Sequence, residues 1–281
     1  GERVLHLAFS QSLLACEVED DENLARFCLI SSPTHPIASF EYAPPWPVRI
    51  LLSHPQIQKY NSIFGVLLQL KFAKARLDQS WTSISFLRKQ SSRICPDLHV
   101  ACCLRSQMSF FLNVLLHQLQ IHLIDLHFAK METAITMKTN YHQVEEIHSN
   151  FLDQVLLFPF LSHVPLHRCL VNITAQCIRF SGFLEARFPS NSGSGSTRGV
   201  PKPTTNEEEL SKLTRDFHRQ SRLALELLAS FEKKNEWDWW FPVSSACFTI
   251  IVQPFLYLDM TCIFFLPLSF SHCPNLKRLG W

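Results

Sequence analysis

Glutamate and histidine are the side chains whose spacing first suggests chemistry in this sequence. Glu145 and His148 form a Glu-x-x-His motif, which di-iron sites in helical bundles use to ligate metal. Such a site needs a second Glu-x-x-His and further glutamates, and the sequence has no second copy. His163 and His167 are four residues apart, but Pro165 lies between them and no third ligand is evident. We interpret Glu145 and His148 as part of an exposed polar helix face, and His163 and His167 as a structural pair. A metal-dependent helical enzyme remains an alternative that rests on Glu145 and His148 alone.

The cysteines and glycines do not form a known catalytic pattern either. No two of the ten cysteines are spaced as Cys-x-x-Cys, which argues against zinc ribbons and thioredoxin-like redox motifs. We therefore expect reduced thiols in a cytoplasmic protein. Gly193-Ser194-Gly195 is not followed by the Gly-Lys-Ser/Thr of a phosphate loop. The sequence predicts no enzyme activity, no cofactor and no metal site.

Composition excludes several broad classes. The chain has 281 residues, of which 47% are hydrophobic and 18% charged, so wholesale disorder is excluded. Its net charge of +2 gives no electrostatic footprint for nucleic acid as a general partner. Only 7 residues are glycine, which disfavours an all-β fold rich in tight turns. The sequence begins with Gly1 rather than Met, so we expect a fragment or a partial gene model.

Apolar residues recur at helical spacing through most of the chain, which predicts an all-α fold, an elongated helical bundle. A short irregular or β segment precedes it in residues 1–45, with possible strands at 4–7 and 27–30. The expected helices are 53–81, 103–130, 140–158, 165–188 and 206–234, the last capped by Asn206. Val48–Leu52 is expected to be a short strand or extended entry. Residues 82–100 are expected to be a loop, and residues 189–205 a flexible Ser/Gly/Pro linker.

The predicted domain covers residues 46–234 and is followed by an apolar tail, residues 235–281. Residues 239–258 contain no charged side chain, and about 20 apolar residues can span a bilayer. A tail-anchored helical membrane protein is therefore an alternative. Pro242 and Pro254 make this segment a poor transmembrane helix, so a membrane is not the expected partner. We expect the tail to be non-native sequence that packs poorly.

Several motifs in the right order resemble the C-terminal domain of γ-tubulin complex components. The similarity covers roughly residues 42–231. Its motifs are Trp46–Ser53 (WPVRILLS), Lys59–Phe64 (KYNSIF), Leu104–Met108 (LRSQM), His148–Leu152 (HSNFL) and Phe217–Ser221 (FHRQS). This resemblance implies a helical bundle that binds γ-tubulin and, with other γ-tubulin complex components, nucleates microtubules at organising centres in the cytoplasm. It implies no catalysis.

The late helix carries the candidate partner-binding residues. Basic side chains crowd one region of it, and γ-tubulin is expected to be acidic, so charge could steer the two together. The alternative is an ordinary solvated helix face. The candidate residues are Lys212, Arg215, His218, Arg219 and Arg222.

Overall fold

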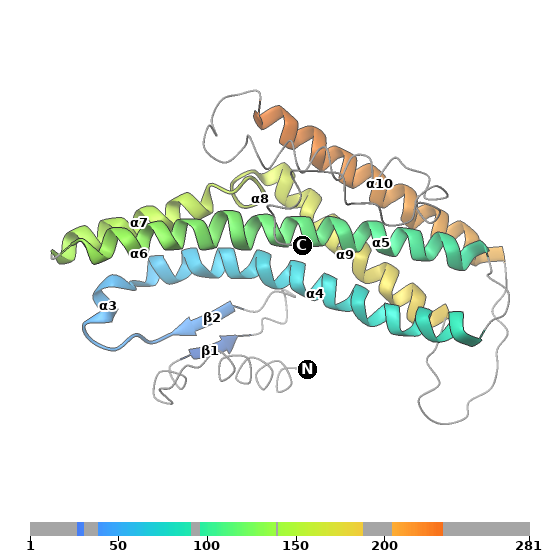
Figure 1. Cartoon of the computed structure of the whole chain (residues 1–281), viewed down its shortest axis with the longest axis horizontal. Coiled ribbons are helices and arrows are strands. Elements are labelled where there is room, and N and C mark those ends of the chain that lie inside the picture. Colours follow the sequence, from blue (N-terminus) through green and yellow to red (C-terminus); the bar gives the residue numbers. More distant parts are fainter. Residues whose placement is uncertain (1–26, 31–38, 91–95, 139, 188–203, 233–281) are drawn as a thin grey trace, which may run out of the picture.

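The computed structural model describes residues 27–30, 39–90, 96–138, 140–187 and 204–232. These residues form a two-stranded sheet followed by helices that make an elongated bundle (Figure 1). In chain order, the elements are β1 Phe27–Ile30, β2 Ser39–Tyr42, α3 Val48–Leu51, α4 His54–Gln90, α5 Pro96–His117, the π-helix η1 Gln118–Asp125, α6 Leu126–Thr136, α7 Tyr141–Leu156, α8 Pro159–Ser162, α9 Val164–Arg187 and α10 Thr204–Glu232.

Helix α4 is the central element of the bundle. It packs against α5, α7 and α9, and α10 lies over α9 and also reaches α5. Helices α5, η1 and α6 follow one another as one long rod, and α7 folds back along α6 at the far end (Figure 1). The expectation of an all-α, elongated bundle with a short β segment before it is confirmed.

The core is built from large apolar side chains that each long helix turns inward. Leu70 of α4, Phe180 of α9 and Phe217 of α10 are all buried. The rings of Phe111, on α5, and Phe217 meet edge to face with centroids 6.1 Å apart, which is a favoured aromatic geometry. This contact joins α10 to α5, so α10 is part of the bundle rather than an appendage.

The β-hairpin is attached to α4 through Asn61 and Phe64. Strands β1 and β2 pair antiparallel, with Leu29 opposite Phe40. The Asn61 side chain accepts a hydrogen bond from the Phe40 N–H and donates one to the Phe40 carbonyl, both at 2.9 Å. The Phe40 ring also packs edge to face on Phe64, with centroids 5.5 Å apart. Asn61 thus satisfies both backbone groups of Phe40 and fixes the hairpin on the bundle.

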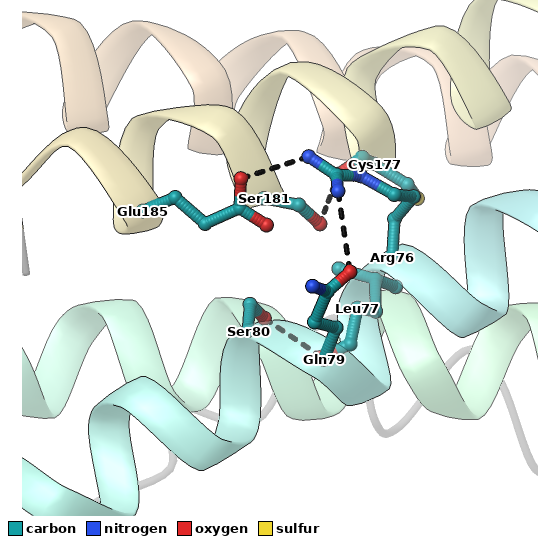
Figure 2. Close-up of polar contacts among 7 residues, drawn as sticks. All are labelled: Arg76, Leu77, Gln79, Ser80, Cys177, Ser181 and Glu185. Carbon is teal, nitrogen blue, oxygen red and sulfur yellow. Dashed lines mark hydrogen bonds and ion pairs between the residues drawn. The ribbon is translucent and has the colours of Figure 1, made fainter. Parts of the chain in front are cut away.

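A polar link joins α4 to α9 where the two helices cross (Figure 2). The Arg76 guanidinium donates to the Glu185 carboxylate at 2.9 Å and to the Gln79 side chain at 3.2 Å. Ser80 and Ser181 lie beside them. Each hydroxyl donates a hydrogen bond to a carbonyl of its own helix, that of Leu77 for Ser80 and that of Cys177 for Ser181. The ion pair is about one third exposed on each side, so it is only partly screened by water.

A second set of polar contacts joins α4 to α7. The Tyr60 hydroxyl and His148 Nε2 are 2.9 Å apart; His148 is buried and Tyr60 is half-buried. The Gln56 amide donates to the Ser149 hydroxyl at 3.5 Å, and Lys59 pairs with Asp153. These contacts hold the α6–α7 hairpin on the start of α4.

Several predicted boundaries are confirmed. Phe27–Ile30 is a strand, and the Asn140 side chain caps α7 by accepting a hydrogen bond from the His142 N–H at 3.1 Å. Helix α7 ends before Pro159, and α9 occupies Val164–Arg187. The possible strand at 4–7 lies outside the described residues.

Three local predictions are wrong. Val48–Leu51 forms a short helix, because the Arg49 and Leu52 N–H groups bond back to Pro45 and Val48 carbonyls rather than to a strand. Residues 82–90 continue α4 and residues 96–100 belong to α5, so most of the predicted loop is helical, and residues 91–95 lie outside the described residues. Buried Ile84 explains why serine-rich sequence there stays helical. Helix α10 begins at Thr204, two residues before the predicted cap Asn206, and therefore also takes in the end of the predicted linker.

Candidate functional site: a basic stripe on helix α10

Glu145 and His148 do not form a metal site. Glu145 is exposed, and its carboxylate lies 3.8 Å from the imidazole of His142. The prediction of an exposed polar face is wrong for His148, because its ring is buried against Tyr60 in the α4–α7 contact. Burial lowers the pKa of His148, and the nearby charge of Lys59 lowers it further, so the ring is neutral at pH 7. The two side chains thus have separate partners.

His163 and His167 also have a structural setting. Nδ1 of His167 donates a hydrogen bond to the Phe160 carbonyl at 3.1 Å, which holds the turn between α8 and α9. Within the described part of the chain, no three His, Cys, Asp or Glu side chains gather closely enough to hold a metal ion.

The described cysteines Cys102, Cys103, Cys169 and Cys177 are thiols rather than disulfides. Burial raises the pKa of Cys169 and Cys177, so both stay protonated at neutral pH. Cys103 Sγ lies 3.8 Å from Nδ1 of His99, but burial and then the neighbouring Cys102 raise the pKa of Cys103 too. A protonated thiol is a poor nucleophile, so this pair is not an activated Cys–His dyad.

Four of the five candidate residues on α10 share one exposed face. They lie three or four residues apart, which places them along one side of a helix. The opposite side is buried and includes Phe217, Ser221 and Ala224. We call the four exposed side chains the basic stripe; they are Lys212, Arg215, Arg219 and Arg222.

His218 is not part of the basic stripe. Its Nε2 donates a hydrogen bond to the Gln107 side chain of α5 at 2.9 Å, so the ring points into the helix contact. Burial lowers the pKa of His218, and the positive charge of Arg222 lowers it further. His218 is therefore a neutral packing residue, and the sequence alone could not separate it from its basic neighbours.

Local contacts hold two of the stripe side chains in place. The Arg219 guanidinium pairs with Asp216 at 3.4 Å, and Nε of Arg215 donates to the Ser211 carbonyl at 3.3 Å. Arg219 is 73% exposed, so its pair with Asp216 is screened by water and leaves most of the charge available to a partner. Leu223 is exposed at the edge of the stripe.

A second cluster was not predicted from the sequence. His117 and His122 lie five residues apart, yet their rings are neighbours with centroids 5.2 Å apart. In an α-helix, residues five apart point in different directions, so helical periodicity gives no signal for this pair. The π-helix η1 brings them together.

The longest apolar helical run belongs to the core. Leu98–Thr136 is long and apolar enough to cross a membrane by length and composition, with 44% of the most apolar window buried. Its inward side chains, including Met108, Phe111 and Leu119, pack in the bundle, as those of a core helix do. The apolar segment 239–258 lies outside the described residues.

The described residues define the class of protein by its fold, an elongated α-helical bundle. Among the candidate histidines, His148, His167 and His218 each make a hydrogen bond that holds helices or turns of the bundle together. The sequence model of the family described as Gamma tubulin complex component C-terminal matches residues 5–266. The chain therefore belongs to the γ-tubulin complex component family, whose members are structural components rather than known enzymes.

Curated relatives agree with this assignment. The chain is 28% identical over 189 residues to mouse gamma-tubulin complex component 4. This match covers 67% of this chain and 26% of the mouse protein. It is 27% identical to the human component 4 over the same length. It is also 22% identical over 186 residues to Arabidopsis thaliana gamma-tubulin complex component 2, covering 65% of this chain and 27% of that protein. The chain thus spans about a quarter of the length of these relatives. The match does not favour a tail-anchored membrane protein.

Proposed function

We propose that this chain binds γ-tubulin through its helical bundle and contributes to microtubule nucleation together with other γ-tubulin complex components. The observation that carries the proposal is the family match over residues 5–266. The resemblance of the motifs in α4, α5, α7 and α10 supports it, because these motifs lie on helices of one bundle. The proposed place of action is the cytoplasm, at microtubule organising centres. The proposed role is that of a docking component without catalysis.

We further propose that the basic stripe of α10 contacts γ-tubulin. From Lys212 to Arg222 the stripe is about 15 Å long, because an α-helix rises about 1.5 Å per residue. It presents four positive charges on the exposed face of α10, and γ-tubulin is expected to offer an acidic surface. Such complementarity raises the association rate and fixes orientation more than it adds affinity.

Co-precipitation tests the proposed function directly. The full chain, immobilised on beads, is expected to retain purified γ-tubulin and to retain much less αβ-tubulin dimer. The circular-dichroism spectrum of the same sample shows whether the bundle is folded. If a folded chain retains no γ-tubulin above bare beads, the proposal is wrong.

A further inference from the structure

The rod formed by α5 and α6 contains an unusual winding at its centre. Gln118–Asp125 is a π-helix, and it joins its neighbours without a break, since His117 and Leu126 at its two ends are both helical. The Leu126 N–H bonds to the Ile121 carbonyl, five residues earlier. Leu119 and Leu123 anchor this stretch in the core. π-helical turns are rare and occur frequently at functional sites.

This winding creates a pair of neighbouring imidazoles. An α-helix has 3.6 residues per turn, so residues five apart are separated by about 140° around the axis. A wider π turn brings positions i and i+5 onto one side. His117 and His122 accordingly have ring centroids 5.2 Å apart and ring planes inclined by 55°. Both side chains are half-buried, so solvent reaches the pair.

We propose that His117 and His122 form a two-histidine chelating site for a divalent transition-metal ion of the zinc class. A Zn–N bond is about 2.0–2.1 Å and the ring centre lies about 1.1 Å beyond the nitrogen, so each centroid would be about 3.2 Å from the metal. Two imidazoles in tetrahedral positions then have centroids about 5 Å apart. The observed 5.2 Å matches this separation.

The chemistry of the pair fits such an ion. Neutral imidazole is a ligand for zinc, nickel and copper ions. Because the described residues supply no group of three ligands, water would complete the coordination. The site is therefore open, unlike a closed structural zinc site.

Metal binding at this place would also act on the fold. The two rings are neighbours in the π winding and not in an α winding, so a bound ion stabilises the π winding over the α alternative. The α6–α7 hairpin continues from η1. A bound ion would thus fix the join between this hairpin and the rest of the rod.

Titration calorimetry with Zn²⁺ and with Ni²⁺ on the purified full chain tests the proposal. We expect one saturable site per chain that is lost in His117→Gln and in His122→Gln, while both variants keep the helical circular-dichroism signal. His142→Gln, at an exposed histidine on α7, is the matched control and is expected to bind as the unchanged chain does. Metal is also expected to raise the thermal midpoint of the unchanged chain, and not that of His122→Gln.

A thiol site is the main competing outcome, because His99 and Cys103 also lie close together. The Cys103→Ser variant is expected to retain binding, and Co²⁺ is expected to give no thiolate charge-transfer absorption. Loss of binding in Cys103→Ser, or in His142→Gln, would place the ion elsewhere and overturn the proposal. Absence of saturable binding by the unchanged chain would overturn it as well.

Discussion

Arg215 and Arg219 lie one helical turn apart at the centre of the basic stripe, where both guanidinium groups are exposed. Reversing both charges, in Arg215→Glu with Arg219→Glu, leaves the buried face of α10 unchanged. If the stripe contacts γ-tubulin, binding is expected to weaken by roughly tenfold or more, about 1.4 kcal/mol, with most of the change in the association rate. Surface plasmon resonance at low and physiological salt measures the affinity and the association rate.

The matched control reverses two exposed positive charges on other helices, Lys71 of α4 and Lys130 of α6. Lys71→Glu with Lys130→Glu changes the net charge by the same amount, so it removes the same non-specific attraction. This control is expected to bind nearly as well as the unchanged chain. Equal weakening in both double variants would mean that net charge, and not the stripe, is responsible.

Arg76 and Glu185 provide a residue-scale test of the contact between α4 and α9. Glu185→Ala leaves the half-buried guanidinium of Arg76 without its carboxylate, and is expected to lower the free energy of unfolding by about 1–2 kcal/mol. Asp78→Ala breaks the more exposed i,i+4 pair with Lys74 and is expected to cost about 0.5 kcal/mol or less. Urea unfolding measures both variants. A Glu185→Ala cost no larger than that of Asp78→Ala would contradict the structural importance of the link.

At the scale of the element, the contact between α4 and α7 makes stability depend on pH. Burial lowers the pKa of His148 below the ordinary value of about 6.5. The unfolded chain therefore binds a proton at a higher pH than the folded one. The stabilisation is fully present above about pH 6.5 and is lost as the pH falls below it. Burial also lowers the pKa values of His122, His127 and His218, which act in the same direction.

The urea concentration at the unfolding midpoint is accordingly expected to decrease as the pH is lowered from 7 to 5. His148→Gln removes one of the contributing groups and is expected to make this fall shallower, and its weaker contact with Tyr60 is expected to lower the stability at pH 7. His142→Gln changes an exposed histidine on the same helix and is expected to leave the pH profile unchanged. A steeper profile in His148→Gln than in the unchanged chain would contradict the assignment of His148 as a buried neutral group.

The sequence predicted the elements with strong helical periodicity and clear termini. Asn140 before α7 and Pro159 after it define one such helix, and α9 was predicted within a residue at each end. Prediction from the sequence failed where tertiary contacts determine the secondary structure. An example is Ile84, whose burial in the core keeps the serine-rich end of α4 helical. Two features of the histidines could not be predicted from the residue types. The side chain of His218 points into the contact with α5, and the rings of His117 and His122 are neighbours because of the π-helix.

At the scale of the whole molecule, we propose that residues 235–281 are not required for the bundle, whose described helices end at Glu232. A chain ending at Lys234 is expected to keep the helical signal and the thermal midpoint of the full chain and to be more soluble, because an apolar segment is removed. Circular dichroism and sedimentation of the expressed protein measure these properties. Loss of helical signal, or precipitation of the shortened chain while the full chain stays soluble, would show that the tail belongs to the fold.

The pairing of α4 with α9 has a consequence for synthesis of the protein. Gln69 bonds Thr174, and Arg76 bonds Glu185, across more than a hundred residues of sequence. During translation, α4 leaves the ribosome long before its main partner exists, at about 5–20 residues per second. For several seconds its apolar side can be covered only by α5 and α7 or by a chaperone. A nascent chain that stops before α9 would therefore leave one side of its central helix uncovered and exposed to solvent.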